Sequence, residues 1–249
     1  MYPNISDLRS FYDSGLGDLP RRFIRAQLRK LWPNVGGLNV LGLGYATPHL
    51  RIFAEEAQRV LAFMPAQQGT LPWPAEGPNA TALVEETALP LPEGSIDRLL
   101  IVHALENTQN IGALLQEAWR VLAGQGRMII VVPKRGGFWA MDSSNPFGFG
   151  FSFSLGHIRR LLAHHRFEVS RCRRALFVPP FAQKFLAPSA GWIENFGAHV
   201  LPALAGVLVI EVSKQVYARP PAEKARIEKP VLLPLPELIA PSPTTGRWS

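Results

Sequence analysis

The chain has 249 residues, of which 47% are hydrophobic, so it can bury a sizeable core, most simply as one domain. Its formal net charge of +7 and sequence pI of about 10.0 favour anionic neighbours such as nucleic acid, acidic proteins or lipid headgroups. No segment is long and apolar enough to span a bilayer, and residues 1–15 lack the pattern of a secretory signal. The single cysteine, Cys172, excludes an intrachain disulfide, and we therefore expect a cytoplasmic protein.

The first part of the chain predicts a helix followed by alternating strands and connections. Asp7–Trp32 has apolar residues at helical spacing and a basic opposite face, and Gly15 and Gly17 are expected to divide this helix. Short apolar runs then predict strands, separated by a helix and by a long Pro- and Gly-rich loop. The predicted elements are strands at Leu38–Leu43, Arg59–Phe63 and Ala80–Val84, a helix at Pro48–Ala57, and a loop at Met64–Asn79.

The segment from Glu85 to Pro133 predicts a complete strand–helix–strand unit. Leu99–Val102 is continuously apolar, as a strand covered on both faces should be. Leu114–Leu122 carries apolar residues at helical spacing, and Gly124 is expected to end the helix. Arg127–Val132 is the next predicted strand. Such a unit indicates an open α/β sheet with a ligand crevice at the strand ends.

The rest of the chain predicts further elements and one insertion. Pro179–Ala205 is rich in apolar residues and is expected to form a helical insertion or lid. The sequence beyond Arg219 is Pro-rich and predicts a disordered tail. The other elements are a loop at Lys134–Phe153, a helix from the cap Ser154 to His165, and strands at Phe167–Phe177 and Gly206–Tyr217.

The order and spacing of LPLPEGSID, HALEN and LLQEAWRVLAGQGRMIIVVP resemble the type 11 group of class I S-adenosylmethionine-dependent methyltransferases. The resemblance extends from about Val40 to Val216. It implies a doubly wound, Rossmann-like α/β sheet of seven strands, mostly parallel with an antiparallel last strand, and helices on both faces. We expect one methyltransferase-like domain over 1–218, including an N-terminal helical segment at 1–35, the insertion at 179–205 and a tail at 219–249.

The resemblance makes the turn after the first strand the cofactor loop. In the family pattern LDxGxGxG, Gly42 takes the acidic position and Gly44 the first glycine, whereas Ala46 and Pro48 take the second and third. With Tyr45, these residues are expected to contact S-adenosylmethionine through backbone groups and the start of a helix. Because one glycine of the pattern remains, an ordinary strand-to-helix turn is the alternative.

The end of the second strand lacks the carboxylate that the family uses to bind the ribose hydroxyls. The loss of such a charge-assisted contact weakens binding by about tenfold to a few hundredfold. We expect Met64, Pro65 and the following loop to cover the cofactor, with Gln67, Gln68 or backbone groups in place of the carboxylate. The alternative is a crevice that no longer binds the cofactor.

Two further strand ends carry candidate residues. Glu85 takes the family position that contacts the adenine amino group, with Glu86 as the alternative by one place; a solvated acid is the structural interpretation. His103 closes the fourth strand and is expected to contact cofactor or substrate, or to serve as a base. A structural histidine is the alternative, and Glu106 is expected to cap or solvate the next turn.

The resemblance implies methyl transfer to an unidentified acceptor. A carbon or oxygen acceptor needs a base, for which His103 and His157 are the candidates, whereas a nitrogen acceptor needs a free lone pair. No metal-ligand cluster or nucleophilic triad is expected. Loop residues expected to flank a mouth suited to an apolar or planar substrate are Tyr45, Asp142, Asn145, Phe147, Phe151 and His157.

Two other functions remain open from the sequence. The eroded cofactor loop is typical of a catalytically inactive, methyltransferase-like binding or regulatory subunit. The apolar insertion and positive charge also fit an enzyme that contacts a membrane surface and modifies a lipid-like acceptor. A protein partner is expected at 179–205 or at the basic region 156–174, and no nucleic-acid-binding module is present.

Overall fold

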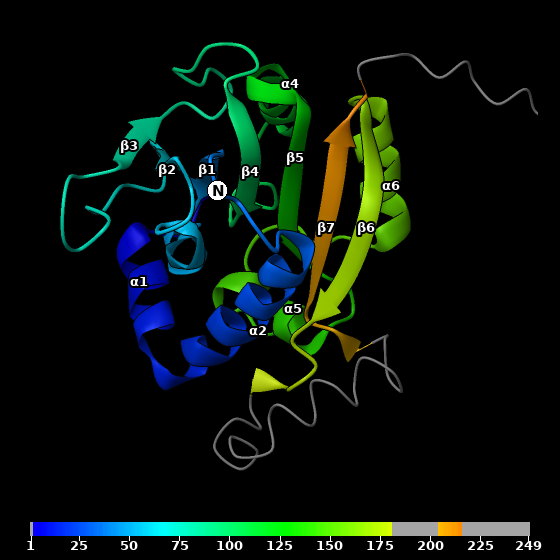
Figure 1. Ribbon diagram of the computed structural model, residues 1–249. Helices are drawn as coiled ribbons and strands as arrows, with labels where there is room; N and C mark the ends of the chain where they lie inside the picture. Colours follow the sequence, from blue (N-terminus) through cyan, green and yellow to red (C-terminus); the bar gives the residue numbers. More distant parts are fainter. Residues whose placement is uncertain (1, 181–203, 216–249) are drawn as a thin grey trace, which may run out of the picture. The chain divides into compact units, whose positions relative to one another are not determined.

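Seven strands form one sheet in the order β3-β2-β1-β4-β5-β7-β6 (Figure 1). The computed structural model describes residues 2–180 and 204–215, which fall within one unit, Met1–Val216. Neighbouring strands among β1 to β5 pair in parallel, whereas β7 is antiparallel to both β5 and β6. The strands are β1 Asn39–Gly44, β2 Arg59–Pro65, β3 Thr81–Val84, β4 Ile96–Val102, β5 Leu122–Pro133, β6 Phe167–Ala175 and β7 Val207–Lys214. This topology confirms the predicted doubly wound, mostly parallel sheet with an antiparallel last strand.

Helices cover both faces of this sheet. In Figure 1, α2 crosses the front face, and α4 and α6 lie behind the strands. The helices are α1 Ile5–Asp13, α2 Gly15–Leu31, α3 Thr47–Leu50, α4 Ile111–Val121, α5 Phe138–Met141 and α6 Leu155–His164, with 3-10 turns η1 Arg51–Phe53 and η2 Pro146–Gly148.

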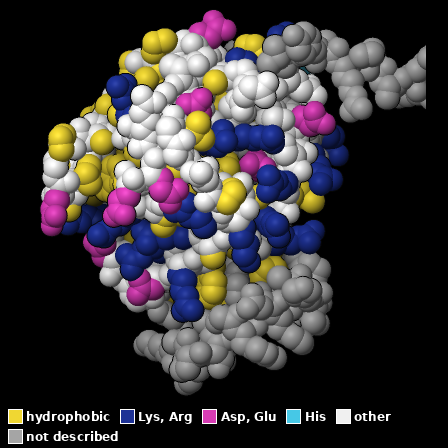
Figure 2. All heavy atoms as spheres, in the orientation of Figure 1, with side chains coloured by type: hydrophobic (Ala, Val, Ile, Leu, Met, Phe, Trp, Pro, Cys, Tyr) yellow, Lys and Arg dark blue, Asp and Glu magenta, His cyan; other side chains and the backbone are white. Residues whose placement is uncertain are grey.

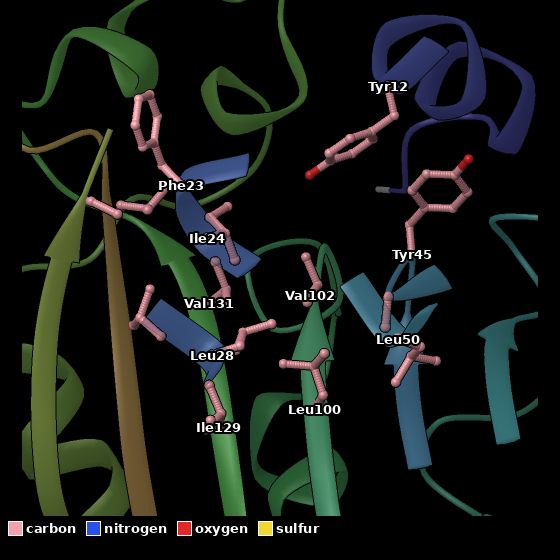
Figure 3. Close-up of a cluster of buried hydrophobic side chains, with 14 of the residues drawn as sticks. Tyr12, Phe23, Ile24, Leu28, Tyr45, Leu50, Leu100, Val102, Ile129 and Val131 are labelled. Atoms are coloured by element: carbon pink, nitrogen blue, oxygen red, sulfur yellow. The ribbon is translucent and has the colours of Figure 1, made fainter. Parts of the chain in front are cut away.

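Alternate residues of each central strand pack on opposite faces, which explains their continuous apolar runs. Leu100 and Val102 of β4 belong to the cluster beneath α2, which Figure 3 shows with Ile24 and Leu28 above the strands. The intervening Leu99 and Ile101 pack on the other face, in the cluster with these residues of α4 and α6: Leu114, Leu115, Ala118, Ile158 and Leu162. Both faces of the sheet are therefore buried, and the candidate site lies at the carboxyl ends of the parallel strands.

Helix boundaries differ from the predictions at three places. The N-terminal helix breaks at Ser14, whose hydroxyl caps α2 by accepting from the Gly17 N–H, rather than at the glycines. The helix predicted at Pro48–Ala57 is only α3 followed by η1, because Ala57 already pairs with Gly36 and the chain must turn back into β2. α4 ends at Val121 and not at Gly124, since Leu122 already pairs with Ile96 in the sheet.

The structure describes only some of the elements predicted for the C-terminal part of the chain. Ser154 caps α6 as predicted, by accepting from the His157 N–H. The insertion predicted at Pro179–Ala205 lies largely outside the described residues, as does the predicted tail. Within the described ranges, no helix is both long and apolar enough to cross a membrane.

Candidate functional site

The turn between β1 and α3 brings backbone close to the end of β4. Gly44 has φ +85°, and a Cβ at this position would lie 2.2 Å from the Val102 carbonyl oxygen. The next residue, Tyr45, donates its N–H to that same carbonyl at 2.9 Å. A Cβ on Gly42 would lie 2.6 Å from the Leu50 side chain, so packing of α3 on β1 excludes the acidic residue of the family pattern. The turn therefore requires a glycine at position 44 for its backbone conformation, whereas at position 42 the packing of α3 excludes a side chain.

The end of β4 carries a chain of three buried polar side chains. His103 Nε2 lies 2.9 Å from the Tyr12 hydroxyl, and His103 Nδ1 lies 3.2 Å from Glu106 Oε1. A carboxylate only accepts, so the proton on His103 is assigned to Nδ1, and the Tyr12 hydroxyl donates to Nε2. The prediction that Glu106 is solvated or capping is wrong, because the left-handed backbone of His103, with φ 54°, turns the following residues inward. Such a conformation in a residue other than glycine is frequent at functional sites.

The acidic residues after β3 point in opposite directions. Glu85 is exposed and accepts from the Thr87 hydroxyl. Glu86 is buried, and its Oε1 accepts from the Tyr2 hydroxyl at 3.0 Å and from the Thr108 hydroxyl at 3.1 Å. Of the two adenine-site candidates, Glu86 is therefore the one that faces the crevice.

The end of β2 and the loop after it contain buried apolar residues and one buried side-chain amide without a hydrogen-bond partner. Met64 and Pro65 are buried, and Gln67 is exposed. The Gln68 side chain is buried, and neither its amide nitrogen nor its oxygen has a hydrogen-bond partner. The Gln68 carbonyl accepts from the Ile5 N–H at 3.0 Å, so the first turn of α1 lies against this loop.

The Tyr12 side chain lies beside Tyr45, beyond the ends of β1 and β4 (Figure 3). The centroid of its ring lies 5.6 Å from those of Tyr45 and His49, and the Phe147 ring packs 4.8 Å from that of His103. Sequence reasoning missed Tyr2 and Tyr12 as site residues. No local signal could have found them, because both act through contacts with residues more than eighty positions away.

Burial dominates the electrostatics of this region. It raises the pKa of Tyr12 well above its usual range, with Tyr45 and Glu106 acting in the same direction. Burial also raises the pKa of Tyr45 to about 12. The pKa of His49 is lowered well below its ordinary value, first by burial and then by the charges of His103 and nearby arginines. His49 is fully buried with neither ring nitrogen hydrogen-bonded, so it is neutral at neutral pH.

The other predicted site residues divide into inward and outward groups. Ala46, Asn145 and Phe147 are buried at the crevice side, and Asn145 donates to the Trp139 carbonyl. Phe151 is 67% exposed. His157 is exposed in the first turn of α6, where its ring packs against Phe153 of the opposite cluster. Asp142 binds the Ser144 N–H and hydroxyl, which lower the pKa of its carboxyl.

Two cavities border α1. An open groove of about 860 Å³ lies on its outer side, lined by residues that include Asp7, Phe11 and Phe149. A smaller pocket of about 190 Å³ is lined by Tyr45 and three arginines, among other residues: Arg21, Arg25 and Arg51. Figure 2 shows Lys and Arg side chains spread over the face on which α2 lies. Neither cavity is lined by Gly44, Glu86 or His103.

No group of three or more potential metal ligands occurs among the residues that the structure describes. The polar groups of the candidate site are the buried Tyr12–His103–Glu106 chain, Glu86, Gln68 and the backbone around Gly44.

The solved structures with similar folds include methyltransferases at low sequence identity. A methyltransferase of Haloferax volcanii, solved with the Trm112 methyltransferase activator, has TM-score 0.58 and 14% identity, covering 86% of this chain and 99% of that one. The 1,6-didemethyltoxoflavin-N1-methyltransferase of Burkholderia thailandensis, with bound 1,6-didemethyltoxoflavin and S-adenosylhomocysteine, has TM-score 0.53 and 18% identity, covering 85% and 87%. An S-adenosylmethionine-dependent methyltransferase of Mesorhizobium loti has TM-score 0.52 and 17% identity, covering 75% and 95%. These similarities establish the fold.

A search of curated proteins gave no match to this sequence. Residues 29–130 match the family described as methyltransferase domain, in its type 11 group, and this segment runs from the end of α2 through most of β5. It includes the β1 turn, the two acidic residues after β3 and the His103–Glu106 segment. This match identifies a methyltransferase domain of the type 11 group over residues 29–130, and the similar solved structures show that the chain has the fold of S-adenosylmethionine-dependent methyltransferases.

Proposed function

We propose that the methyl transfer of this family takes place here at the carboxyl ends of β1 and β4, with His103 as the group that accepts the proton of the methyl acceptor. The observation that carries the proposal is the Tyr12–His103–Glu106 chain, in which a hydroxyl already donates to His103 Nε2. An acceptor hydroxyl in the place of the Tyr12 hydroxyl would have the same partner at hydrogen-bond distance.

The contacts of His103 with its neighbours make it suitable as a base. Glu106 Oε1 receives the Nδ1–H, which fixes the imidazole orientation and leaves the Nε2 lone pair directed towards Tyr12. When Nε2 takes a proton, the nearby Glu106 carboxylate stabilises the imidazolium that forms. His103 would therefore activate an oxygen or acidic carbon acceptor, and Glu106 would act as a positioning residue. His157, exposed and packed on Phe153, is the weaker of the two candidates for this role.

S-adenosylmethionine is the methyl donor of the family, and the polar groups at the edge match part of what it requires. Glu86 remains the candidate for the adenine amino group, and the unpartnered Gln68 amide, in the loop after β2, is the candidate substitute for the ribose-binding acid of the family. The space does not fit, however, while α1 is docked. Small-molecule sites typically enclose about 300–1,000 Å³, whereas the side chains of Tyr2, Leu8 and Tyr12 are buried at this edge.

The acceptor and partners can be assigned by class. We propose a small planar acceptor that reaches the His103 imidazole beside Phe147, whose ring centroid lies 4.8 Å from that of His103. The Burkholderia neighbour, which holds a small aromatic molecule, supports this choice. A protein partner at the basic region 156–174 is supported by the Haloferax complex with its activator. The free Cys172 supports a cytoplasmic location.

A second function is favoured by the same observation, that side chains of the N-terminal segment fill the carboxyl ends of the strands. A protein that keeps α1 docked permanently would be a methyltransferase-like binding or regulatory subunit without catalysis. The two functions differ in whether S-adenosylmethionine binds at all.

Calorimetric titration with S-adenosylmethionine and S-adenosylhomocysteine separates them. We expect heat of binding for both ligands, together with a rise in Tm that grows with ligand concentration. Transfer of labelled methyl groups to a panel of hydroxyaromatic, amine and carbon acceptors then tests the reaction. Absence of binding at millimolar ligand would refute the catalytic proposal and leave the regulatory subunit.

A further inference from the structure

The N-terminal helix occupies the position at which the nucleoside part of the cofactor would bind. The hydroxyl of Tyr2 donates to Glu86 Oε1, the candidate adenine contact, and lies 3.4 Å from the Ala104 carbonyl. The hydroxyl of Tyr12 donates to His103. The N-terminal segment thus places two phenols, Tyr2 before α1 and Tyr12 on it, on two of the polar groups assigned above to ligand binding.

The surface under α1 is more polar than the helix can satisfy. Gln68 has both side-chain polar atoms unpartnered, His49 has both ring nitrogens unpartnered, and Glu106 keeps one such carboxylate oxygen, Oε2. All three residues are at least 98% buried. Buried polar atoms without partners are disfavoured and are uncommon in folded proteins. Their concentration here indicates a surface that binds a polar ligand when α1 is absent.

α1 is held mainly along one side. Ile5, Leu8 and Tyr12 are buried, whereas Asp7 and Ser10 are exposed and line the groove of about 860 Å³. The helix ends at Ser14, whose extended backbone separates it from α2. This break allows α1 to change its position without a change in the helical conformation of α2.

From these contacts we infer that α1 is a resident occupant of the cofactor site, held by Tyr2 and Tyr12, and that it withdraws when S-adenosylmethionine or S-adenosylhomocysteine binds. This inference depends on the proposed function, since it assumes that the cofactor binds at this edge. The docked helix then competes with the ligand, so the apparent affinity equals the intrinsic affinity reduced by the fraction of molecules in which α1 has withdrawn.

The experiment compares S-adenosylhomocysteine binding by three full-length proteins. The double variant Tyr2→Phe/Tyr12→Phe keeps both rings but loses both hydroxyls. The matched control Ser6→Ala loses one hydroxyl on the exposed side of the same helix. We expect the double variant to bind about tenfold or more tightly than the wild type, since it removes two hydrogen bonds of the docked state, and the control to bind like the wild type.

Hydrogen exchange provides a second readout in the wild-type protein. Saturation with S-adenosylhomocysteine should accelerate exchange of the amides of Ile5–Asp13. Equal affinity of all three proteins, with unchanged exchange in α1, would overturn the inference and leave the proposed function intact. If none of the three proteins binds S-adenosylhomocysteine at millimolar concentration, the proposed function fails and the inference fails with it.

Discussion

The hydroxyl of Tyr12 lies 2.9 Å from His103 Nε2, and this contact joins the N-terminal helix to the end of β4. The same nitrogen is the one that would receive a proton from a methyl acceptor. If His103 is the base, as we propose, the Tyr12 hydroxyl occupies its Nε2 in the described conformation, and a methyl acceptor has to displace it. Because Glu106 holds the other ring nitrogen, the imidazole keeps its orientation whether Tyr12 is present or withdrawn.

Loss of the His103 imidazole should remove activity towards oxygen and carbon acceptors. We expect His103→Gln to lower kcat by about 10²–10⁴-fold, the range typical of a general base. Glu106→Gln keeps the volume and a hydrogen-bond acceptor but removes the charge that stabilises the imidazolium, so its loss should be smaller, about tenfold. Steady-state kinetics with KM measured separately for donor and acceptor check both values. Wild-type turnover by His103→Gln would contradict the assignment.

The turn at Gly44 should tolerate no side chain. Gly44→Ala would combine an unfavourable positive φ with a Cβ 2.2 Å from the Val102 carbonyl oxygen, and we expect a loss of more than about 3 kcal/mol in the free energy of unfolding. Gly136 is the matched control, because it also has positive φ but has open space around its Cβ position. Gly136→Ala should cost about 1 kcal/mol. Urea denaturation measures both, and equal losses would show that the steric contact is unimportant.

The family signature around Glu117 and Arg120 has a structural role. Arg120 donates to the carbonyls of Leu91 and Leu89, each at 2.8 Å, and pairs with Glu117, which accepts the Leu89 N–H. These contacts hold the LPLP segment against α4. The signature therefore identifies the fold without belonging to the candidate site.

Replacement of Arg120 tests this structural role. We expect Arg120→Ala to lower the free energy of unfolding by about 2–3 kcal/mol, since its hydrogen bonds are charge-assisted and two of them serve backbone carbonyls. Arg9→Ala breaks an exposed pair with Asp13 and should cost less than about 1 kcal/mol. Urea denaturation compares the two variants. A loss for Arg120→Ala no larger than that for Arg9→Ala would refute the role.

The strands and their order of appearance could be predicted because each central strand is buried on both faces. Leu99–Val102 is apolar without interruption for this reason, and the helix and strand that follow it are confirmed, although α4 ends at Val121 and β5 begins at Leu122 rather than at the predicted Arg127. Helix lengths were less predictable. α3 is short because of the pairing of Ala57 with Gly36, a contact that local periodicity does not encode.

The candidate site was predicted only where it lies on strand ends. The positions of Gly44, Glu86 and His103 follow from the order of the strands. The role of Glu106 could not be predicted, because its burial results from the left-handed backbone of His103. The involvement of Tyr12 depends on the packing of a helix 91 residues away in sequence, and its place in an amphipathic helix gives no indication of a polar partner.

Buried His49 should make the fold sensitive to acid. Its pKa is lowered well below the ordinary value of about 6.5 by burial and by neighbouring positive groups, whereas in the unfolded chain it is free to take a proton. The unfolded state therefore binds more protons than the folded state once the pH falls below about 6.5, so this contribution to stability is present above that pH and is lost as the pH decreases. The limiting slope for one group is about 1.4 kcal/mol per pH unit.

A variant without the imidazole isolates this effect from the other titrating groups. His49→Leu fills the site with an apolar side chain and removes two unpartnered buried nitrogens. We expect the difference in the free energy of unfolding between His49→Leu and the wild type to be constant from pH 7 to 8 and to shift in favour of the variant between pH 6.5 and 5. Urea denaturation across this range measures the difference. A difference that does not change with pH would show that His49 is protonated equally in both states, and hence that the environment under α1 accepts a charge.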